Sequence, residues 1–135
     1  MNRLTKDEYY LSIALAVSAR GTCLRRNYGA VIINNDEIVG TGYTGAPRRE
    51  ANCCDIGYCE RDKQNCLPGE RYELCRSVHA EMNAVIAAGR KNCIGGTIYI
   101  SGMDMKKGQM ISSTPCLLCG RVLTNAGIVN VVGSK

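Results

Sequence analysis

Apolar and polar positions recur along this chain with two different periods, which predict helices and strands in turn. The first period is helical: after a capping-box sequence at Thr5 and Glu8, apolar residues recur at Leu11, Ile13, Ala14, Ala16 and Val17. Gly21 is expected to end this helix. Residues 30–33 and 38–43 are short strand-like runs around an Asn-Asn-Asp turn, which predicts a β-hairpin.

The second half of the chain predicts two helices that alternate with two strands. Helical spacing returns at residues 78–88 and 116–126, and each of these segments is followed by glycine. Short apolar runs at residues 97–100 and 128–132 are the expected strands. Because these strands flank a helix, a right-handed crossover would make them parallel neighbours. With the hairpin, they predict the α/β class, a mixed sheet with helices on its faces.

Two stretches interrupt this pattern. Residues at about 44–77 lack regular periodicity yet hold five cysteines, and residues 101–114 are expected to form a polar loop. An irregular segment as long as the first needs a function or an internal staple. We expect a single domain, residues 1–135, with a Cys-rich insertion at about 44–77. Gly40 and Gly42, just before it, indicate that another element approaches the hairpin closely.

The overall composition argues against a membrane protein and otherwise limits function little. It is 45% hydrophobic and 21% charged, and no run of about 18 apolar residues is present. The charged N-terminal segment lacks the apolar core of a signal peptide, so a cytoplasmic location is expected. The net charge of +5 is compatible with an anionic substrate, but a charge of this size is also common on solvated surfaces.

Nine cysteines and a single histidine indicate metal chemistry. Without a signal peptide, disulfides are the weaker explanation. The histidine lies in H-A-E at residues 79–81, and P-C-L-L-C occupies residues 115–119. His79, Cys116 and Cys119 therefore offer one imidazole and two thiolates. Three such ligands leave the fourth zinc position open for water, which is typical of catalytic rather than structural zinc.

Glu81, two residues after the histidine, is the expected general acid/base. Zinc lowers the pKa of bound water toward ~7, and Glu81 would move its proton to a ring nitrogen and then to a leaving amine. Alone, a C-x-x-C pair could be a redox pair or half of a structural zinc site, and a lone histidine could be a polar contact. The combination favours catalysis, because H-x-E…P-C-x-x-C is the signature of zinc nucleobase deaminases.

The remaining cysteines allow a second, structural zinc site. No second histidine exists, so its ligands would be thiolates that staple the insertion. The expected ligands are Cys23, Cys53 or Cys54, Cys75, and Cys59 or Cys66. Alternatively, several of these cysteines are free buried thiols that pack as small hydrophobic groups. Cys93, in a glycine-rich turn, is not an expected ligand.

Over most of its length, the chain resembles the deoxycytidylate (dCMP) deaminases of the cytidine/deoxycytidylate deaminase superfamily. The similar segments are T-C-L-R-R (22–26), G-Y-T-G-A-P (42–47), N-C-C-D (52–55), E-L-C-R (73–76) and H-A-E-M-N-A (79–84). The resemblance implies a three-layer α/β/α cytidine-deaminase-like fold, with a mixed sheet of four to five strands. It also implies hydrolytic deamination of dCMP to dUMP for thymidylate synthesis, a homo-oligomer (hexamer or dimer), and dCTP and dTTP as allosteric effectors.

The same resemblance assigns substrate contacts. The zinc ligands and Glu81 keep the roles given above, and the Ala80 backbone is similar to one that meets the pyrimidine edge. Thr44 stands where the superfamily has an asparagine that contacts the sugar hydroxyl, and a hydroxyl lacks the two-ended reach of an amide. Arg25 and Arg26 are the first candidates for binding a phosphate, ahead of Arg48 and Arg49.

Three other functions share some of these features, and the sequence also departs from the family in two places. Residues 101–114 exceed the family's usual link, and the chain ends after the fourth expected strand, where relatives continue. A tRNA adenosine deaminase or a free cytidine deaminase shares the zinc motifs but lacks the Cys-rich insertion, so a nucleic-acid partner is not expected. A non-catalytic, zinc-stapled nucleotide-binding module is a third possibility. Glu81 argues against it, because a structural zinc site has no use for a neighbouring carboxylate.

Overall fold

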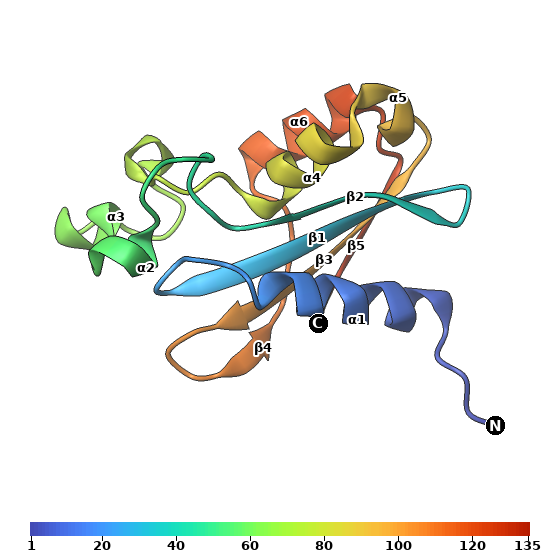
Figure 1. The fold of residues 1–135 in the computed structure, drawn as a ribbon, viewed down its shortest axis with the longest axis horizontal. Helices are drawn as coiled ribbons and strands as arrows, with labels where there is room; N and C mark the ends of the chain where they lie inside the picture. Colours follow the sequence, from blue (N-terminus) through green and yellow to red (C-terminus); the bar gives the residue numbers. More distant parts are fainter.

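The computed structural model describes residues 1–135 and confirms the mixed α/β architecture (Figure 1). Helix α1 covers one face of a five-stranded sheet, and α4, α5 and α6 cover the other. The elements are α1 Lys6–Ser18, β1 Arg26–Asn34, β2 Glu37–Tyr43, α2 Cys53–Ile56, α3 Glu60–Lys63, a 3₁₀ turn η1 Tyr72–Leu74, α4 Ala80–Ala88, α5 Arg90–Cys93, β3 Thr97–Asp104, β4 Gln109–Ile111, α6 Leu117–Ala126 and β5 Asn130–Gly133. None of these helices has the length and apolar character needed to cross a membrane.

Strand β1 is central to the sheet. It pairs antiparallel with β2 on one side and with β3 on the other, and β3 in turn pairs parallel with β5. Both the predicted hairpin and the predicted parallel neighbours are therefore confirmed. Alternate β1 residues are buried on opposite faces of the sheet, because Ala30 and Ile32 pack toward α4 and α6 while Val31 and Ile33 pack toward α1.

The prediction of a polar loop at residues 101–114 was wrong, since most of this segment forms a second hairpin. Strand β3 continues through Asp104 and pairs with β4. The Asp104 side chain closes the turn by accepting from the backbone N–H of Lys106 at 2.9 Å and of Lys107 at 3.0 Å. Gly108 then adopts a left-handed φ of 65°, which glycine tolerates at little cost. The last strand is consequently the fifth and not the fourth.

The N-terminal helix begins as predicted and packs slightly differently. Thr5 Oγ1 accepts from Glu8 N at 3.1 Å while Glu8 Oε1 accepts from Thr5 N at 3.0 Å, which completes the capping box. The helix ends at Ser18, before Gly21, and Ala16 is exposed instead of buried. Tyr10 is buried in its place, because its hydroxyl reaches the β1–β2 turn and donates to Asp36 Oδ1 at 2.7 Å.

The predicted close approach at the hairpin glycines is confirmed. Helix α4 lies directly over β2. A Cβ built on Gly40 would stand 2.7 Å from Ala84 O, and one built on Gly42 would stand 2.3 Å from Ala84 N. Glycine on the strand and alanine on the helix thus let the two backbones nearly touch. This contact fixes the height of α4, and with it the N-terminus of that helix, above the sheet.

The Cys-rich insertion lies beyond one end of the sheet (Figure 1). It contains only the short elements α2, α3 and η1. Backbone hydrogen bonds tie it to the body of the fold: Cys54 N donates to Thr22 O at 3.1 Å, and Gly45 and Val78 exchange two bonds of 3.3 and 2.7 Å. The insertion is thereby held beside the N-terminus of α4.

Candidate metal centre and active site

Two helix N-termini bring the predicted metal ligands together. His79 is the N-cap of α4, and Cys116 is the N-cap of α6, a helix that packs beside α4. Cys119 lies in the first turn of α6 and is fully buried. His79 Nδ1 lies 3.2 Å from Cys119 Sγ and 3.6 Å from Cys116 Sγ, and the three ligand atoms lie within 4.8 Å of one another.

These three side chains fit a zinc ion. Zn–S and Zn–N bonds of normal length at a tetrahedral angle place sulfur and nitrogen about 3.6 Å apart, close to the separations found here. Cys119 N also donates to Cys116 Sγ at 3.4 Å, as amides at helix N-termini do for thiolates. Burial raises the pKa of the Cys119 thiol, and neighbouring Glu81 and Cys116 raise it further. A cation at this point is what would let both sulfurs ionise.

Glu81 lies on the first turn of α4, next to the metal ligands. Its side chain is only 6% exposed, yet it lines a cavity together with His79 and Cys116. A carboxyl group in this position is screened from bulk water but faces whatever occupies the cavity. This is the placement that proton transfer to a bound ligand requires.

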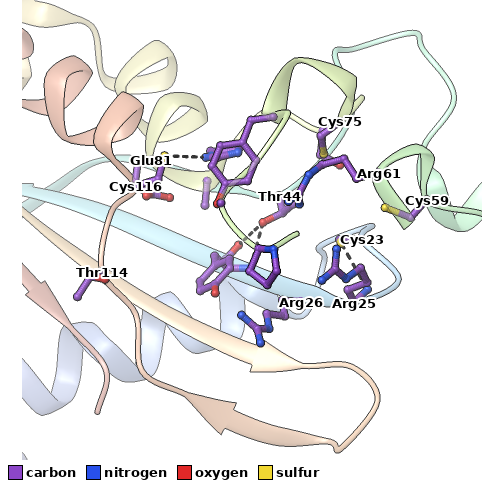
Figure 2. Close-up of a pocket in the computed structure, with 17 residues that line it drawn as sticks. Cys23, Arg25, Arg26, Thr44, Cys59, Arg61, Cys75, Glu81, Thr114 and Cys116 are labelled. Carbon is purple, nitrogen blue, oxygen red and sulfur yellow. Dashed lines mark hydrogen bonds between the residues drawn. The ribbon is translucent and has the colours of Figure 1, made fainter. Parts of the chain in front are cut away.

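The cavity encloses about 190 Å³ and extends from the metal ligands to the insertion. Figure 2 shows Glu81 and Cys116 at one end and Cys23 and Cys59 at the other, with Arg61 between them. All four residues predicted to bind substrate line it, namely Ala80, Thr44, Arg25 and Arg26. The weaker candidates Arg48 and Arg49 are exposed and lie outside the cavity.

The Thr44 hydroxyl is already engaged by the fold. The side chain is buried, and its Oγ1 accepts from Tyr28 N on strand β1 at 3.1 Å. Thr44 therefore lines the cavity while using its hydroxyl to hold β1. An asparagine there would have had an amide end left over for a ligand.

The structure also brings Tyr72 and Arg61 to the cavity, and neither was foreseen from the sequence. The Tyr72 ring meets the His79 imidazole edge-on at a centroid distance of 5.2 Å, and the Arg61 guanidinium lies 4.7 Å from the centre of the Tyr72 ring. Both residues lie in the irregular insertion, where no periodicity shows which side chains point inward. The only sequence signal for the contact between Arg61 and Tyr72 is the presence of a cation and an aromatic residue eleven positions apart.

Four of the six cysteines considered for a second zinc gather near the insertion end of the cavity. Burial raises the pKa of the Cys53 thiol, and the adjacent thiols of Cys23, Cys75 and Cys59 raise it further. The sulfur atoms of these four cysteines lie farther apart than the 4.8 Å within which the ligand atoms of His79, Cys116 and Cys119 lie. Cys54 is exposed and points at Asp55, and Cys66 does not line the cavity. Cys93 is buried in the main core, so it is no part of this group, as expected.

Comparisons with known proteins place these features in a family. Residues 4–135 match the family model described as the cytidine and deoxycytidylate deaminase zinc-binding region. The chain is 34% identical to a deoxycytidylate deaminase of Mycobacterium phage D29, over 100% of this chain and 98% of that protein. It is 31% identical to the deoxycytidylate deaminase of Schizosaccharomyces pombe, over 93% of this chain but only 36% of that longer protein.

A solved structure has the same fold. The dCMP deaminase of cyanophage S-TIM5, crystallised with dCMP and dUMP, aligns with a TM-score of 0.66 over 96% of this chain and 82% of that one. The two sequences are 22% identical, so this likeness concerns the fold. It agrees with the three-layer arrangement and the five-stranded mixed sheet described above.

Proposed function

Because the chain belongs to the cytidine and deoxycytidylate deaminase family, we propose that it is a single-domain, zinc-dependent enzyme that hydrolyses dCMP to dUMP and ammonia, supplying dUMP for thymidylate synthesis. One observation carries the proposal most directly. His79, Cys116, Cys119 and Glu81 meet at the end of a cavity that also contains three arginine side chains. The proposed metal ligands and the arginines therefore line the same cavity, as binding and deamination of a nucleotide require.

Each residue has a role in this mechanism. His79, Cys116 and Cys119 would hold zinc, which when bound makes a water molecule acidic enough to act as nucleophile near neutral pH. Glu81 takes a proton from the attacking water and delivers it first to the pyrimidine ring nitrogen and then to the departing amine. Ala80, at the start of α4, lines the cavity, and its backbone would meet the pyrimidine edge.

The choice of dCMP rests on two supports. The D29 and yeast relatives are named deoxycytidylate deaminases, and the cyanophage structure with the same fold contains dCMP and dUMP. The cavity wall also carries Arg25, Arg26 and Arg61, which suit a phosphorylated substrate better than a free nucleoside. Arg26 is the first residue of β1 and Arg25 precedes it, so both lie beside the hairpin, as expected from the sequence.

A substrate panel tests the function. We expect ammonia release from dCMP with zinc-loaded protein, and much slower release from CMP, dCTP, deoxycytidine and a tRNA anticodon stem-loop. The physical reason is that the reacting base must reach Glu81 while its phosphate is neutralised by the arginines. Turnover of none of these compounds would remove the enzymatic proposal and leave a nucleotide-binding module.

We also propose a second, structural zinc held by Cys23, Cys53, Cys59 and Cys75. Cys23 Sγ already accepts from Arg25 N at 3.4 Å, a contact typical of sulfur ligands. Ser77 Oγ is the one buried side-chain oxygen or nitrogen with no hydrogen bond of normal geometry, and it faces the Cys53 thiol, whose pKa it lowers. A zinc-bound thiolate at Cys53 would be a stronger acceptor for that hydroxyl than the thiol. The metal would fix an insertion that has only short helices of its own.

The metal content of two variants tests this site. We expect two zinc ions per chain in the natural protein and one in Cys53→Ser, because the remaining sulfurs cannot complete a tetrahedral site. The adjacent Cys54→Ser is the matched control and should keep both, since Cys54 is exposed. Elemental analysis after dialysis gives the count. A single zinc in the natural protein would show that these thiols are not ligands.

Assembly and regulation complete the proposal. We expect a homo-oligomer, either a hexamer or a dimer, in the cytoplasm, with dCTP and dTTP as effectors. The large exposed side chains of Ile86 on α4 and of Leu117 and Leu118 on α6 offer an apolar surface for self-association. Light scattering measures the mass of the assembly. Rates of dCMP deamination with and without dCTP or dTTP test the regulation. A monomer with unchanged rates would contradict both.

A further inference from the structure

Arg61 is a buried cation with no anionic partner. Its side chain is only 9% exposed, and no carboxylate oxygen lies within 4.0 Å of its guanidinium. Burying a charge without a counter-charge is costly, so such groups are normally paired. Arg61 also lines the same cavity as His79 and Glu81.

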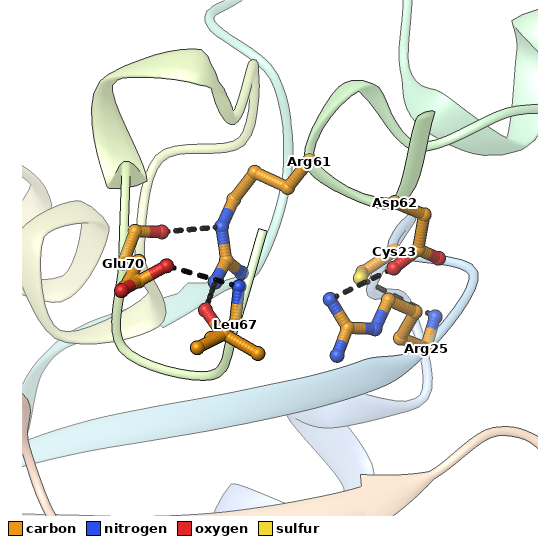
Figure 3. Close-up of polar contacts among 6 residues, drawn as sticks. All are labelled: Cys23, Arg25, Arg61, Asp62, Leu67 and Glu70. Carbon is orange, nitrogen blue, oxygen red and sulfur yellow. Dashed lines mark hydrogen bonds and ion pairs between the residues drawn. The ribbon is translucent and has the colours of Figure 1, made fainter. Parts of the chain in front are cut away.

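The other two arginines of the cavity differ from it. Arg25 is paired with Asp62, with Nη1 and Oδ1 3.1 Å apart, so its charge is already balanced (Figure 3). Arg26 is exposed, and water can solvate its charge. Arg61 is therefore the cavity arginine that is buried and has no carboxylate partner. An anion that enters the cavity gains most by binding there.

The fold holds the Arg61 guanidinium in place and leaves one side of it unused. Nε donates to Glu70 O at 2.9 Å and Nη2 donates to Leu67 O at 3.0 Å (Figure 3). The guanidinium carbon also lies over the Tyr72 ring, 4.7 Å from its centre. Nη1 makes no hydrogen bond within the chain. This is a preorganised donor, since the side chain needs no reordering to accept a ligand oxygen.

Tyr72 lies close to both this donor and the proposed metal centre. The ring centre lies 4.7 Å from the guanidinium carbon and 5.2 Å from the centre of the His79 imidazole. One aromatic side chain is therefore a neighbour of both Arg61 and a proposed metal ligand. A ligand with its ring at the metal and an anionic group on a sugar-length arm would reach both.

We propose that Arg61 binds the phosphate of the nucleotide substrate and makes the chain selective for a nucleoside monophosphate over the nucleoside. The proposal rests on the function given above and names the residue on which its substrate class depends. Arg61 binds the phosphate directly, and Tyr72 and the carbonyls of Leu67 and Glu70 position its guanidinium.

Steady-state kinetics with dCMP and deoxycytidine test the proposal in Arg61→Gln. We expect kcat/KM for dCMP to fall about 100-fold, the weight of a charge-assisted hydrogen-bonded contact, with kcat/KM for deoxycytidine unchanged. Arg61→Lys should recover part of the loss, because it keeps the charge without the planar fork. Arg71→Gln is the matched control: it removes the same charge from the same insertion, but Arg71 is exposed and lies outside the cavity.

Binding measurements keep this test separate from the proposed reaction. Calorimetry with dUMP, deoxyuridine and inorganic phosphate reports the phosphate contact even in protein that turns nothing over. We expect Arg61→Gln to weaken the binding of dUMP and of phosphate and to leave the binding of deoxyuridine unchanged. An equal loss of affinity for dUMP and deoxyuridine, or no loss of affinity for either, would overturn the role of Arg61. Failure of the natural protein to deaminate dCMP would instead overturn the proposed reaction.

Discussion

Glu81→Gln is expected to lower kcat for dCMP by about 10⁴-fold, the upper range for loss of a general acid/base, while the protein keeps its zinc. Glutamine has nearly the shape of glutamate and so preserves the packing of a side chain that is 6% exposed. It cannot accept a proton from water or return one to the pyrimidine. The carboxyl group is also not one of the three atoms that form the metal group, so the metal should stay.

Ammonia release and zinc content, measured on the same preparation, check this expectation. Glu37→Gln serves as the matched control, because Glu37 is an exposed residue at the start of β2, away from the cavity. It should behave as the natural protein does. Loss of zinc from Glu81→Gln would mean that the carboxylate is a ligand and not a proton carrier. Retention of full activity would remove Glu81 from the mechanism altogether.

Gly42→Ala is expected to lower the free energy of unfolding by about 3 kcal/mol, as overpacking a closed contact does. The added Cβ would lie 2.3 Å from Ala84 N and 2.4 Å from Ala80 O. Both are backbone atoms of α4, so no side-chain rotation relieves the clash. The helix must shift, and because His79 caps that helix, zinc affinity should fall as well.

Gly120→Ala is the matched control for this substitution. Nothing lies within 4 Å of a Cβ at Gly120, which is inside α6. Alanine is the better helix former there, so we expect a gain of about 0.5–1 kcal/mol. Urea unfolding at a fixed zinc concentration compares the two variants. Equal effects at both positions would show that the contact between α4 and β2 yields more easily than its geometry indicates.

Local signals explain what the sequence made predictable. The capping box at Thr5 and Glu8 and the left-handed Gly127 after α6 depend only on neighbouring residues, and both are present in the structure. The metal group was predictable for a related reason: ligand chemistry restricts it to a few residue types, and one histidine leaves little choice. Its geometry follows once two short motifs each begin a helix.

Long-range contacts explain what was missed. The second half of β3 carries Gly102 and polar residues, and it is a strand because Arg26 to Tyr28 pair with it from across the chain. Cys53 and Cys54 are neighbours in sequence, and only the orientation of α2 decides which one is buried. Arg61 gave no local signal either, since its environment is assembled from the 67–70 loop and Tyr72.

The division of the metal ligands between two helix caps has a consequence for the order of folding. His79 and Cys116 are 37 residues apart, and the segment between them includes the whole of β3 and β4. In the folded chain β3 pairs with β1, and helices α4 and α6, which carry the ligands, pack side by side. We therefore expect zinc to bind after the sheet has formed, since the entropy of closing that loop has then already been lost. Its stabilising effect should thus appear as slower unfolding and not as faster folding.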